Sequence, residues 1–331
     1  MTKTVVPVRG RSTLGITASL VFGFLTVTGF VYGADSIKVG VANYNLSNLS
    51  VGVAQKRGFF KEEGIECEIV ALRTNVVIAA LVSGELDYTS LIGSIVGAAA
   101  KGSPLKLIAV SVDRPPLYFV SHPRIKTVNQ LKGSTFGIGS YGTNVEIVTR
   151  RVVKHFGIDP EKEIRVLALG PSPARLAALQ QGVVDVVVVA PPDELKGKKM
   201  GFNVLVKTEE IVKFPYNGMA TSVRKLEQQP DEVKRVVKAI IKANRFIRNN
   251  REGTVQVLID WAKATREDAV ASYDSAYKSF GEDGSISDKD IRTLIENMMK
   301  DAKSSRPILP SDVADLNPLY QAQRELGIGK R

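Results

Sequence analysis

The sequence predicts an α/β protein built from two similar lobes. Three observations carry this prediction: the chain is long, strands and helices alternate along it twice, and one short unit recurs. Among its 331 residues, 44% are hydrophobic and 24% are charged, which is an ordinary globular balance. A single hydrophobic core stops growing near this size, so we expect two compact units.

The first part of the chain alternates strands with helices. Residues 37–41 alternate in polarity and are β-rich, which predicts a strand. A helical pattern covers 49–60, and Gly64 ends it. Thr74 and Asn75 are expected to cap a second helix over 76–82. Further strands are expected at 66–72, 88–91, 105–110 and 117–120, with a helix of small residues at 94–100.

The same alternation then restarts. Residues 183–189 form a nearly continuous β-branched run, which is typical of a strand buried on both faces of a parallel sheet. Ser172 and Pro173 are expected to open a helix as its cap and first residue. The remaining strands are expected at 135–138 and 165–169, and the remaining helices at 144–155, 231–246, 254–263, 266–280 and 288–302.

One nine-residue unit occurs in both halves. Residues 79–87 and 177–185 share Ala-Ala-Leu, a glycine and a final aspartate at one constant offset. Both copies follow a helix start and precede a strand. We therefore expect the same structural unit to be used once in each lobe.

The N-terminal segment predicts export. Lys3, Arg9 and Arg11 form a basic head, and residues 14–31 then carry no charge. Small residues follow, so cleavage is expected after Gly33 or Ala34, which makes 1–34 a secretory signal peptide. The alternative is an uncleaved N-terminal membrane anchor, because the apolar run is long.

Charge and cysteine content exclude several classes of protein. The formal net charge is +11, but the basic residues are scattered and no nucleic-acid motif accompanies them. We interpret them as solvated surface and expect no nucleic-acid partner. Cys67 is the one cysteine in the sequence, so no internal disulfide can form.

Three patterns that suggest cofactors or metals are rejected. Residues 137–142 spell G-x-G-x-x-G, but the acidic residue that a dinucleotide site needs at a second strand end is missing. Residues 279–290 half-match a calcium loop, yet Ser279 and Gly281 replace its first carboxylates. His122 and His155 lack metal-ligand spacing. We expect no cofactor and no metal.

Several segments resemble one known family. The strand IKVG at 37–40, the segment QKRGFFKEEGI at 55–65, the recurring unit and VNQLKGSTFGI at 128–138 carry the resemblance. The chain resembles the substrate-binding proteins of ABC importers, in the branch that serves nitrate, sulfonates, taurine and thiamine-pyrimidine precursors. The resemblance covers about residues 35–300.

The resemblance implies a type II periplasmic-binding fold. Two Rossmann-like lobes are joined by a two-crossing hinge, expected near residues 117–121 and 212–217, and the ligand occupies the cleft between them. Residues 35–118 and 214–331 would form lobe I, and 119–213 would form lobe II. The implied partners are a small molecule and the membrane permease of an ABC transporter, and a monomer is expected.

Ligands of open α/β sheets sit beyond the carboxyl ends of the strands. The loops expected there are rich in short polar residues near helix starts, where free N–H groups favour an anion or a carbonyl. Each such residue could also be a plain helix cap, and the aspartates could form salt bridges instead. The candidate ligand-binding residues are Tyr44, Asn45, Ser47, Asn48, Thr74, Asn75, Ser94, Asp113, Tyr141, Gly142, Thr143, Ser172, Asp193, Tyr216 and Asn217.

The functional hypothesis is a periplasmic solute-binding protein without catalytic activity. It would deliver a small organic or anionic solute, such as a sulfonate, taurine, nitrate or a pyrimidine. Two alternatives stay open, because a fold does not determine a function. One is an enzyme on the same scaffold, either a pyrimidine-precursor synthase or a lyase of small aromatic acids. The other is a ligand-sensing module.

Overall fold

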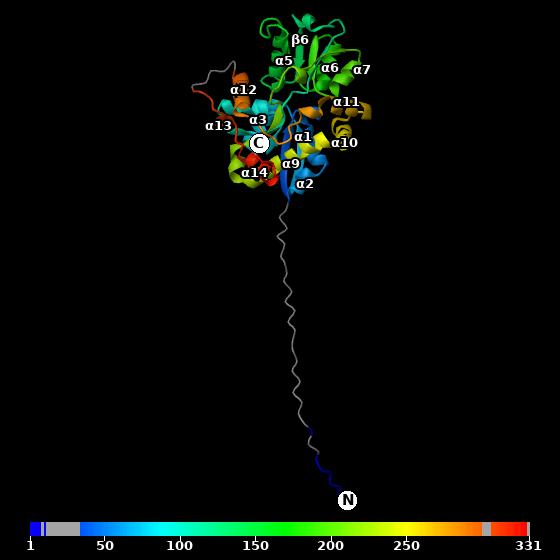
Figure 1. The fold of residues 1–331 in the computed structure, drawn as a ribbon, viewed down its shortest axis with the longest axis vertical. Coiled ribbons are helices and arrows are strands. Elements are labelled where there is room, and N and C mark those ends of the chain that lie inside the picture. Colours follow the sequence, from blue (N-terminus) through cyan, green and yellow to red (C-terminus); the bar gives the residue numbers. More distant parts are fainter. Residues whose placement is uncertain (8–9, 11–33, 300–305, 330–331) are drawn as a thin grey trace. The chain divides into compact units, whose positions relative to one another are not determined.

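The computed structural model describes residues 1–7, 10, 34–299 and 306–329 (Figure 1). The chain divides into residues 1–33 and a compact unit, Ala34–Arg331. The apolar run and the glycine of the predicted cleavage region lie outside the described residues. Among the residues that are described, no helix has both the length and the apolar character needed to cross a bilayer.

The first sheet of the compact unit has five strands in the order β2-β1-β3-β10-β4. Strands β1, β2 and β3 run parallel, whereas β10 runs antiparallel to both of its neighbours. Its strands are β1 (Asp35–Val41), β2 (Ile65–Ala71), β3 (Tyr88–Thr89), β4 (Leu105–Val112) and β10 (Asn217–Ser222).

The second sheet repeats this arrangement in the order β7-β6-β8-β5-β9. Three strands are parallel, and β5 runs antiparallel to both β8 and β9. All four valines of β8 are buried, as the β-branched run predicts. The strands are β5 (Tyr118–Ser121), β6 (Thr135–Ile138), β7 (Arg165–Ala168), β8 (Val186–Val189) and β9 (Asn203–Lys207).

The chain passes twice between the sheets, from β4 to β5 and from β9 back to β10. Figure 1 shows α5, α6 and α7 around the second sheet and α9 and α14 by the first. The helices are α1 (Leu49–Lys56), α2 (Phe59–Glu62), α3 (Thr74–Ser83), α4 (Ile92–Ala100), α5 (Asn144–His155), α6 (Ser172–Gln180), α7 (Asp193–Lys199), α8 (Val223–Gln228), α9 (Pro230–Asn249), α10 (Arg251–Ala262), α11 (Arg266–Ala276), α12 (Asp288–Met298), α13 (Pro310–Val313) and α14 (Asn317–Glu325). Short 3-10 helices are η1 (Leu46–Asn48), η2 (Val128–Leu131), η3 (Thr208–Glu210) and η4 (Tyr277–Ser279).

The recurring unit performs the same task in each sheet. The carboxylate of Asp87 accepts a hydrogen bond of 2.8 Å from the backbone N–H of Lys38 in β1. The carboxylate of Asp185 accepts the equivalent bond of 2.8 Å from Thr135 at the start of β6. The glycine three residues before each aspartate has positive φ, 88° at Gly84 and 72° at Gly182, which a residue with a Cβ rarely adopts. Each copy therefore turns the chain from a helix into the central strand.

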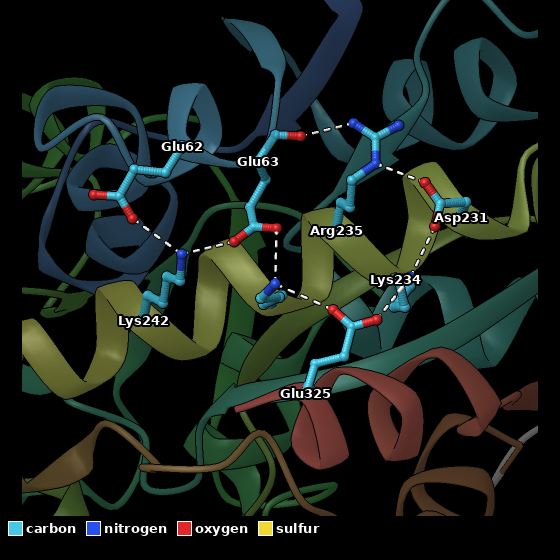
Figure 2. Close-up of polar contacts among 8 residues, drawn as sticks. Glu62, Glu63, Asp231, Lys234, Arg235, Lys242 and Glu325 are labelled. Carbon is cyan, nitrogen blue, oxygen red and sulfur yellow. Dashed lines mark hydrogen bonds and ion pairs between the residues drawn. The ribbon is translucent and has the colours of Figure 1, made fainter. Parts of the chain in front are cut away.

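A cluster of ion pairs fixes helix α9 to its neighbours (Figure 2). The buried carboxylate of Glu63, at the end of α2, lies 2.6 Å from Lys242 and 3.2 Å from Lys238. The backbone carbonyl of Glu63 accepts a hydrogen bond of 2.7 Å from Arg235. Glu325 of α14 pairs with Lys238 at 3.1 Å. Helix α9 thus holds both the N-terminal and the C-terminal parts of this lobe.

Some predicted elements have different limits in the structure. The helix expected over 49–60 is split into α1 and α2, because Gly58 adopts φ 80° between them. The helix expected over 266–280 ends at Ala276 and continues as η4. Thr74 and Ser172 are the first residues of α3 and α6, and the capping positions are Arg73 and Pro171. The predicted capping roles of Thr74, Asn75 and Ser172 were therefore wrong.

Candidate functional site

A cavity of about 590 Å³ lies between the two sheets. Its walls are the loops that follow the carboxyl ends of β1, β2 and β3 in the first sheet and of β6, β7 and β8 in the second. Parallel strands place these loops on one edge of each sheet, which is where open α/β sheets bind ligands. Both lobes therefore contribute to one cavity.

The first lobe contributes a network of buried amides. The Oδ1 atom of Asn48 accepts hydrogen bonds from Ser90 Oγ at 2.7 Å and from Asn217 Nδ2 at 3.0 Å. Asn217 Nδ2 also donates to the backbone carbonyl of Ser47 at 2.7 Å. These amides satisfy each other, so they fix the shape of the cavity wall.

Tyr44 forms another part of the first lobe's wall and packs against Trp261. The rings of Tyr44 and Trp261 meet edge to face, with their centroids 4.7 Å apart. Tyr44 donates to the carbonyl of Ile69 at 3.1 Å, and Trp261 donates to the carbonyl of Asn45 at 3.1 Å. Tyr44 is 43% exposed, so this part of the wall is open to solvent.

The two lobes contact each other beside the cavity. Asn144, the first residue of α5, donates to the carbonyl of Tyr216 at 2.5 Å. Ser94 donates to the carbonyl of Gly142 at 3.3 Å. Elsewhere along the junction, the N–H of Leu46 donates to the carbonyl of Pro191 at 3.1 Å. The structure is thus a conformation in which the lobes touch.

Arg175 of α6 brings a buried positive charge to the cavity. Its side chain donates to Ser172 Oγ at 2.8 Å and to the carbonyl of Val188. Its Nε atom is buried and has no hydrogen-bond partner among the described residues. Burial lowers the pKa of Arg175 to about 10, so the guanidinium stays protonated at neutral pH.

Two acidic residues begin α7 next to this charge. Asp193 lines the cavity and pairs with Lys196 at 2.7 Å. Its neighbour Glu194 is buried, and burial raises the pKa of Glu194 to about 7. Asp193 therefore balances the positive charge of Lys196 within the cavity wall.

Comparisons with known proteins agree with this architecture. A family model described as NMT1/THI5 like matches residues 46–253. The chain belongs to the NMT1/THI5-like family. The predicted resemblance to substrate-binding proteins of ABC importers and the predicted two-lobe α/β fold are both confirmed.

Two relatives differ in how much of this family member they match. The putative binding protein YtlA of Bacillus subtilis is 24% identical over 285 residues, which cover 82% of this chain and 85% of that protein. The 4-amino-5-hydroxymethyl-2-methylpyrimidine phosphate synthase THI5 of Saccharomyces cerevisiae is 28% identical over 121 residues, 34% of either chain. The match to the binding protein therefore extends over both lobes.

Solved structures share the fold. The ligand-binding component of an ABC-type import system from Staphylococcus aureus superposes with a TM-score of 0.75 at 18% identity, over 88% of this chain and 99% of that one. The nitrate-binding protein NrtA of Synechocystis gives 0.72 at 14% identity, over 89% and 90%. The alkanesulfonate-binding protein SsuA of Xanthomonas axonopodis gives 0.67 at 18%, over 78% and 89%.

Most of the predicted site residues of this NMT1/THI5-like protein meet at the cavity. The structure places them in its lining, although their contact with a ligand stays a prediction. These residues are Tyr44, Asn45, Ser47, Asn48, Thr74, Ser94, Thr143, Ser172, Asp193, Tyr216 and Asn217.

Four predicted residues are not among those that line the cavity. Asn75 is exposed on α3, and Tyr141 is 58% exposed with its hydroxyl bonded to the carbonyl of Val166. Gly142 and Tyr141 line a separate groove beside α5. Asp113 lies between β4 and β5, where burial raises the pKa of its carboxyl.

Sequence reasoning missed the cationic residues of the cavity, Arg73, Arg175 and Lys196. Arg175 and Lys196 stand three residues after Ser172 and Asp193, one helical turn further along α6 and α7. Arginine and lysine in helices usually face solvent, so nothing in the local pattern marks them. Asp193 was expected in a loop, but it is the first residue of α7.

Proposed function

We propose that this protein is the solute-binding component of an ABC importer, which delivers a small organic or anionic solute to a membrane permease. The observation that carries the proposal is the cavity enclosed by strand-end loops of both lobes. The putative binding protein, the importer component, the nitrate-binding protein and the alkanesulfonate-binding protein described above support it.

The proposed mechanism is hinge closure around the solute. The hinge comprises the two connections between the sheets, residues 113–117 and 208–216, rather than the expected 117–121, because residues 118–121 form strand β5. The proposed lobes are 35–118 with 214–331 and 119–213. A solute that contacts both cavity walls favours the closed arrangement by its differential affinity. The permease then recognises a surface that exists only when the lobes are together.

The proposed location is outside the cytoplasm. The basic head and apolar run of residues 1–34 would direct export of the chain. The protein would act as a periplasmic monomer, or remain tethered by an uncleaved N-terminal anchor. Either form leaves the cavity free to capture a solute before the permease is reached.

No catalytic step forms part of the proposal. The yeast synthase matches only 34% of this chain, so this match gives little support for the same activity in this protein.

The test is binding combined with a search for turnover. The purified protein is titrated with alkanesulfonates, taurine, nitrate, aromatic carboxylates and pyrimidines, and thermal unfolding is recorded. We expect saturable stabilisation by at least one compound and a smaller radius of gyration in solution scattering. Conversion of that compound would favour the enzyme, and the absence of both stabilisation and closure would refute the proposal.

A further inference from the structure

A buried carboxyl group lies where the two lobes touch. Glu194 is the second residue of α7 in the second lobe and is 4% exposed. Its Oε2 atom is buried and has no hydrogen-bond partner among the described residues. A buried carboxylate without a partner is costly, so the charge state of Glu194 affects the elements that enclose it.

Helix α11 belongs to the first lobe. The hydroxyl of Tyr273 donates to the carbonyl of Ile247 in α9 at 2.8 Å, and Asp274 pairs with Arg251 of α10 at 2.7 Å. Helix α9 is in turn joined to α2 and α14 by the ion-pair cluster described above. Helix α11 therefore moves with the first lobe when the lobes separate.

The same helix reaches across to α7 of the second lobe (Figure 1). The carboxylate of Asp268 in α11 lies 2.7 Å from Lys199 of α7. Tyr118, the first residue of β5, forms a hydrogen bond with Ser275 of α11 and lies near Glu194. Elements of both lobes thus enclose Glu194, and separation of the lobes takes α11 away from it.

We propose that protonation of Glu194 regulates lobe closure, an inference that rests on the solute-binding function above and extends it. The neutral carboxyl group is accommodated beneath α11, so it favours the closed arrangement. The ionised carboxylate gains hydration when α11 moves away, so it favours the open arrangement. The protein therefore holds its solute more tightly below neutral pH than above it.

Two acidic side chains act on Glu194. Asp193 on its own helix and Asp268 of α11 both raise the pKa of its carboxyl through their negative charges. The lysines of α7 are engaged by these aspartates, Lys196 by Asp193 and Lys199 by Asp268, each at 2.7 Å. Among the described residues, no ion pair joins Glu194 itself to a cation. Its ionisation would therefore add a third negative charge to a buried group of acids.

Neighbouring elements place other titratable groups near α7, and each is uncharged or engaged. Burial raises the pKa of Tyr118 in β5 to about 12, so its hydroxyl stays neutral. Lys207 of β9 lies 2.8 Å from Glu209, and Arg175 of α6 donates within its own helix. Burial therefore has the largest effect on Glu194 and raises its pKa to about 7, although backbone N–H groups at the start of α7 act in the opposite direction.

The direction of the pH effect follows from proton uptake on closure. The pKa of the Glu194 carboxyl is about 7 in the closed arrangement, and hydration on opening returns it towards the ordinary 4.5. Between pH 4.5 and 7, closure takes up a proton, so closure becomes less favourable as the pH rises through this window and levels off above it. The ratio of closed to open protein should fall about tenfold between pH 6 and pH 8.

Hydrogen–deuterium exchange measures the closed fraction without any solute. The N–H of Leu46 in the first lobe donates to the carbonyl of Pro191 in the second at 3.1 Å, so protection of this amide reports contact between the lobes. Protection is measured in the purified protein at pH 6 and pH 8, relative to the exchange rate of an unstructured peptide at the same pH. The radius of gyration is recorded by solution scattering under the same conditions.

The variant is Glu194→Gln, and Glu232→Gln is its matched control. Glu232 is 6% exposed, but Lys225 engages its carboxylate at 2.8 Å, away from the junction of the lobes. His122 and His155 remain in both variants, so any pH effect that they cause persists there. If Glu194→Gln fails to fold, Glu194→Met, which has a side chain of similar length without charge, takes its place.

In the unaltered protein, we expect protection of Leu46 to be about tenfold greater at pH 6 than at pH 8, with a smaller radius of gyration at pH 6. In Glu194→Gln, protection should be equal at the two pH values and should match the value of the unaltered protein at pH 6. Glu232→Gln should respond to pH as the unaltered protein does.

Three results overturn the inference. They are a pH response that persists in Glu194→Gln, the absence of a response in the unaltered protein, and a Leu46 amide that is unprotected at both pH values. None of them bears on solute binding, because all are obtained without a solute. The proposed function fails separately, if no compound in the titration described above stabilises or closes the protein.

Discussion

The side-chain amide of Asn144 donates a hydrogen bond of 2.5 Å to the backbone carbonyl of Tyr216. Asn144 opens helix α5 beside the second sheet, whereas Tyr216 directly precedes β10 of the first. Both residues line the cavity. This bond therefore joins the two walls at the point where a solute would be enclosed.

The contact beside this bond leaves no room for a side chain at Gly93. A Cβ atom built there would lie 1.9 Å from Asn144 Oδ1. We expect Gly93→Ala to separate the lobes, because the added methyl group would overlap the side chain of Asn144. Solute binding should weaken by about tenfold, a loss of about 1.4 kcal/mol. Calorimetry and the radius of gyration measure both effects. Gly281→Ala is the control, because a Cβ atom at Gly281 meets nothing within 4 Å.

An ion pair links helices α7 and α11. Lys199 lies 2.7 Å from the carboxylate of Asp268, and the pair spans the junction between the second sheet's helices and the C-terminal helices. We expect Asp268→Asn to weaken solute binding by about two- to fivefold at low ionic strength. The difference from the unaltered protein should shrink in 0.5 M salt, because screening weakens the pair. An effect that persists unchanged in high salt would exclude an electrostatic origin.

Glu194 predicts a pH dependence of stability. Burial raises the pKa of its carboxyl from 4.5 to about 7 in the folded protein. Between pH 4.5 and 7 the folded state binds more protons than the unfolded state, so stability falls as pH rises through this window. Glu194→Gln should therefore gain on the order of 3 kcal/mol at pH 8 and little at pH 4. Urea unfolding at the two pH values measures the gain, and equal effects at both would contradict this account.

The ion-pair cluster on α9 predicts a difference between two adjacent glutamates. The side chain of Glu63 is 6% exposed and engages two lysines, whereas that of Glu62 is 52% exposed and engages one. We expect Glu63→Gln to lower the free energy of unfolding by about 1–3 kcal/mol. Glu62→Gln should change it by about 0.5 kcal/mol or less. Equal losses for the two variants would show that burial does not set the strength of these pairs.

The recurring unit shows how far sequence reasoning reaches. Asp87 and Asp185 were matched by pattern alone, and the carboxylate of each accepts a hydrogen bond from the backbone of a neighbouring strand, β1 or β6. The turn within each unit depends on local chemistry, because a glycine with positive φ ends the preceding helix. Polar residues at strand ends, such as Ser47 and Thr143, could be placed near the cavity because ligands of open α/β sheets sit beyond the carboxyl ends of the strands.

Other features depend on contacts between distant segments. Strand β10 (Asn217–Ser222) was not predicted, because its place between β3 and β4 is set only when the chain returns from the second lobe. Arg175 was missed because its burial results from packing of α6 against β8, which its helical position does not reveal. Tyr141 was expected in the cleft, yet its loop turns it towards Val166 and solvent.

The position of a bound solute tests the central claim most directly. Crystals of the protein with a solute that stabilises it would reveal which atoms surround that molecule. The account predicts density in the 590 Å³ cavity, with contacts from the loops of both sheets. Density at another surface, or contacts from one lobe alone, would contradict it.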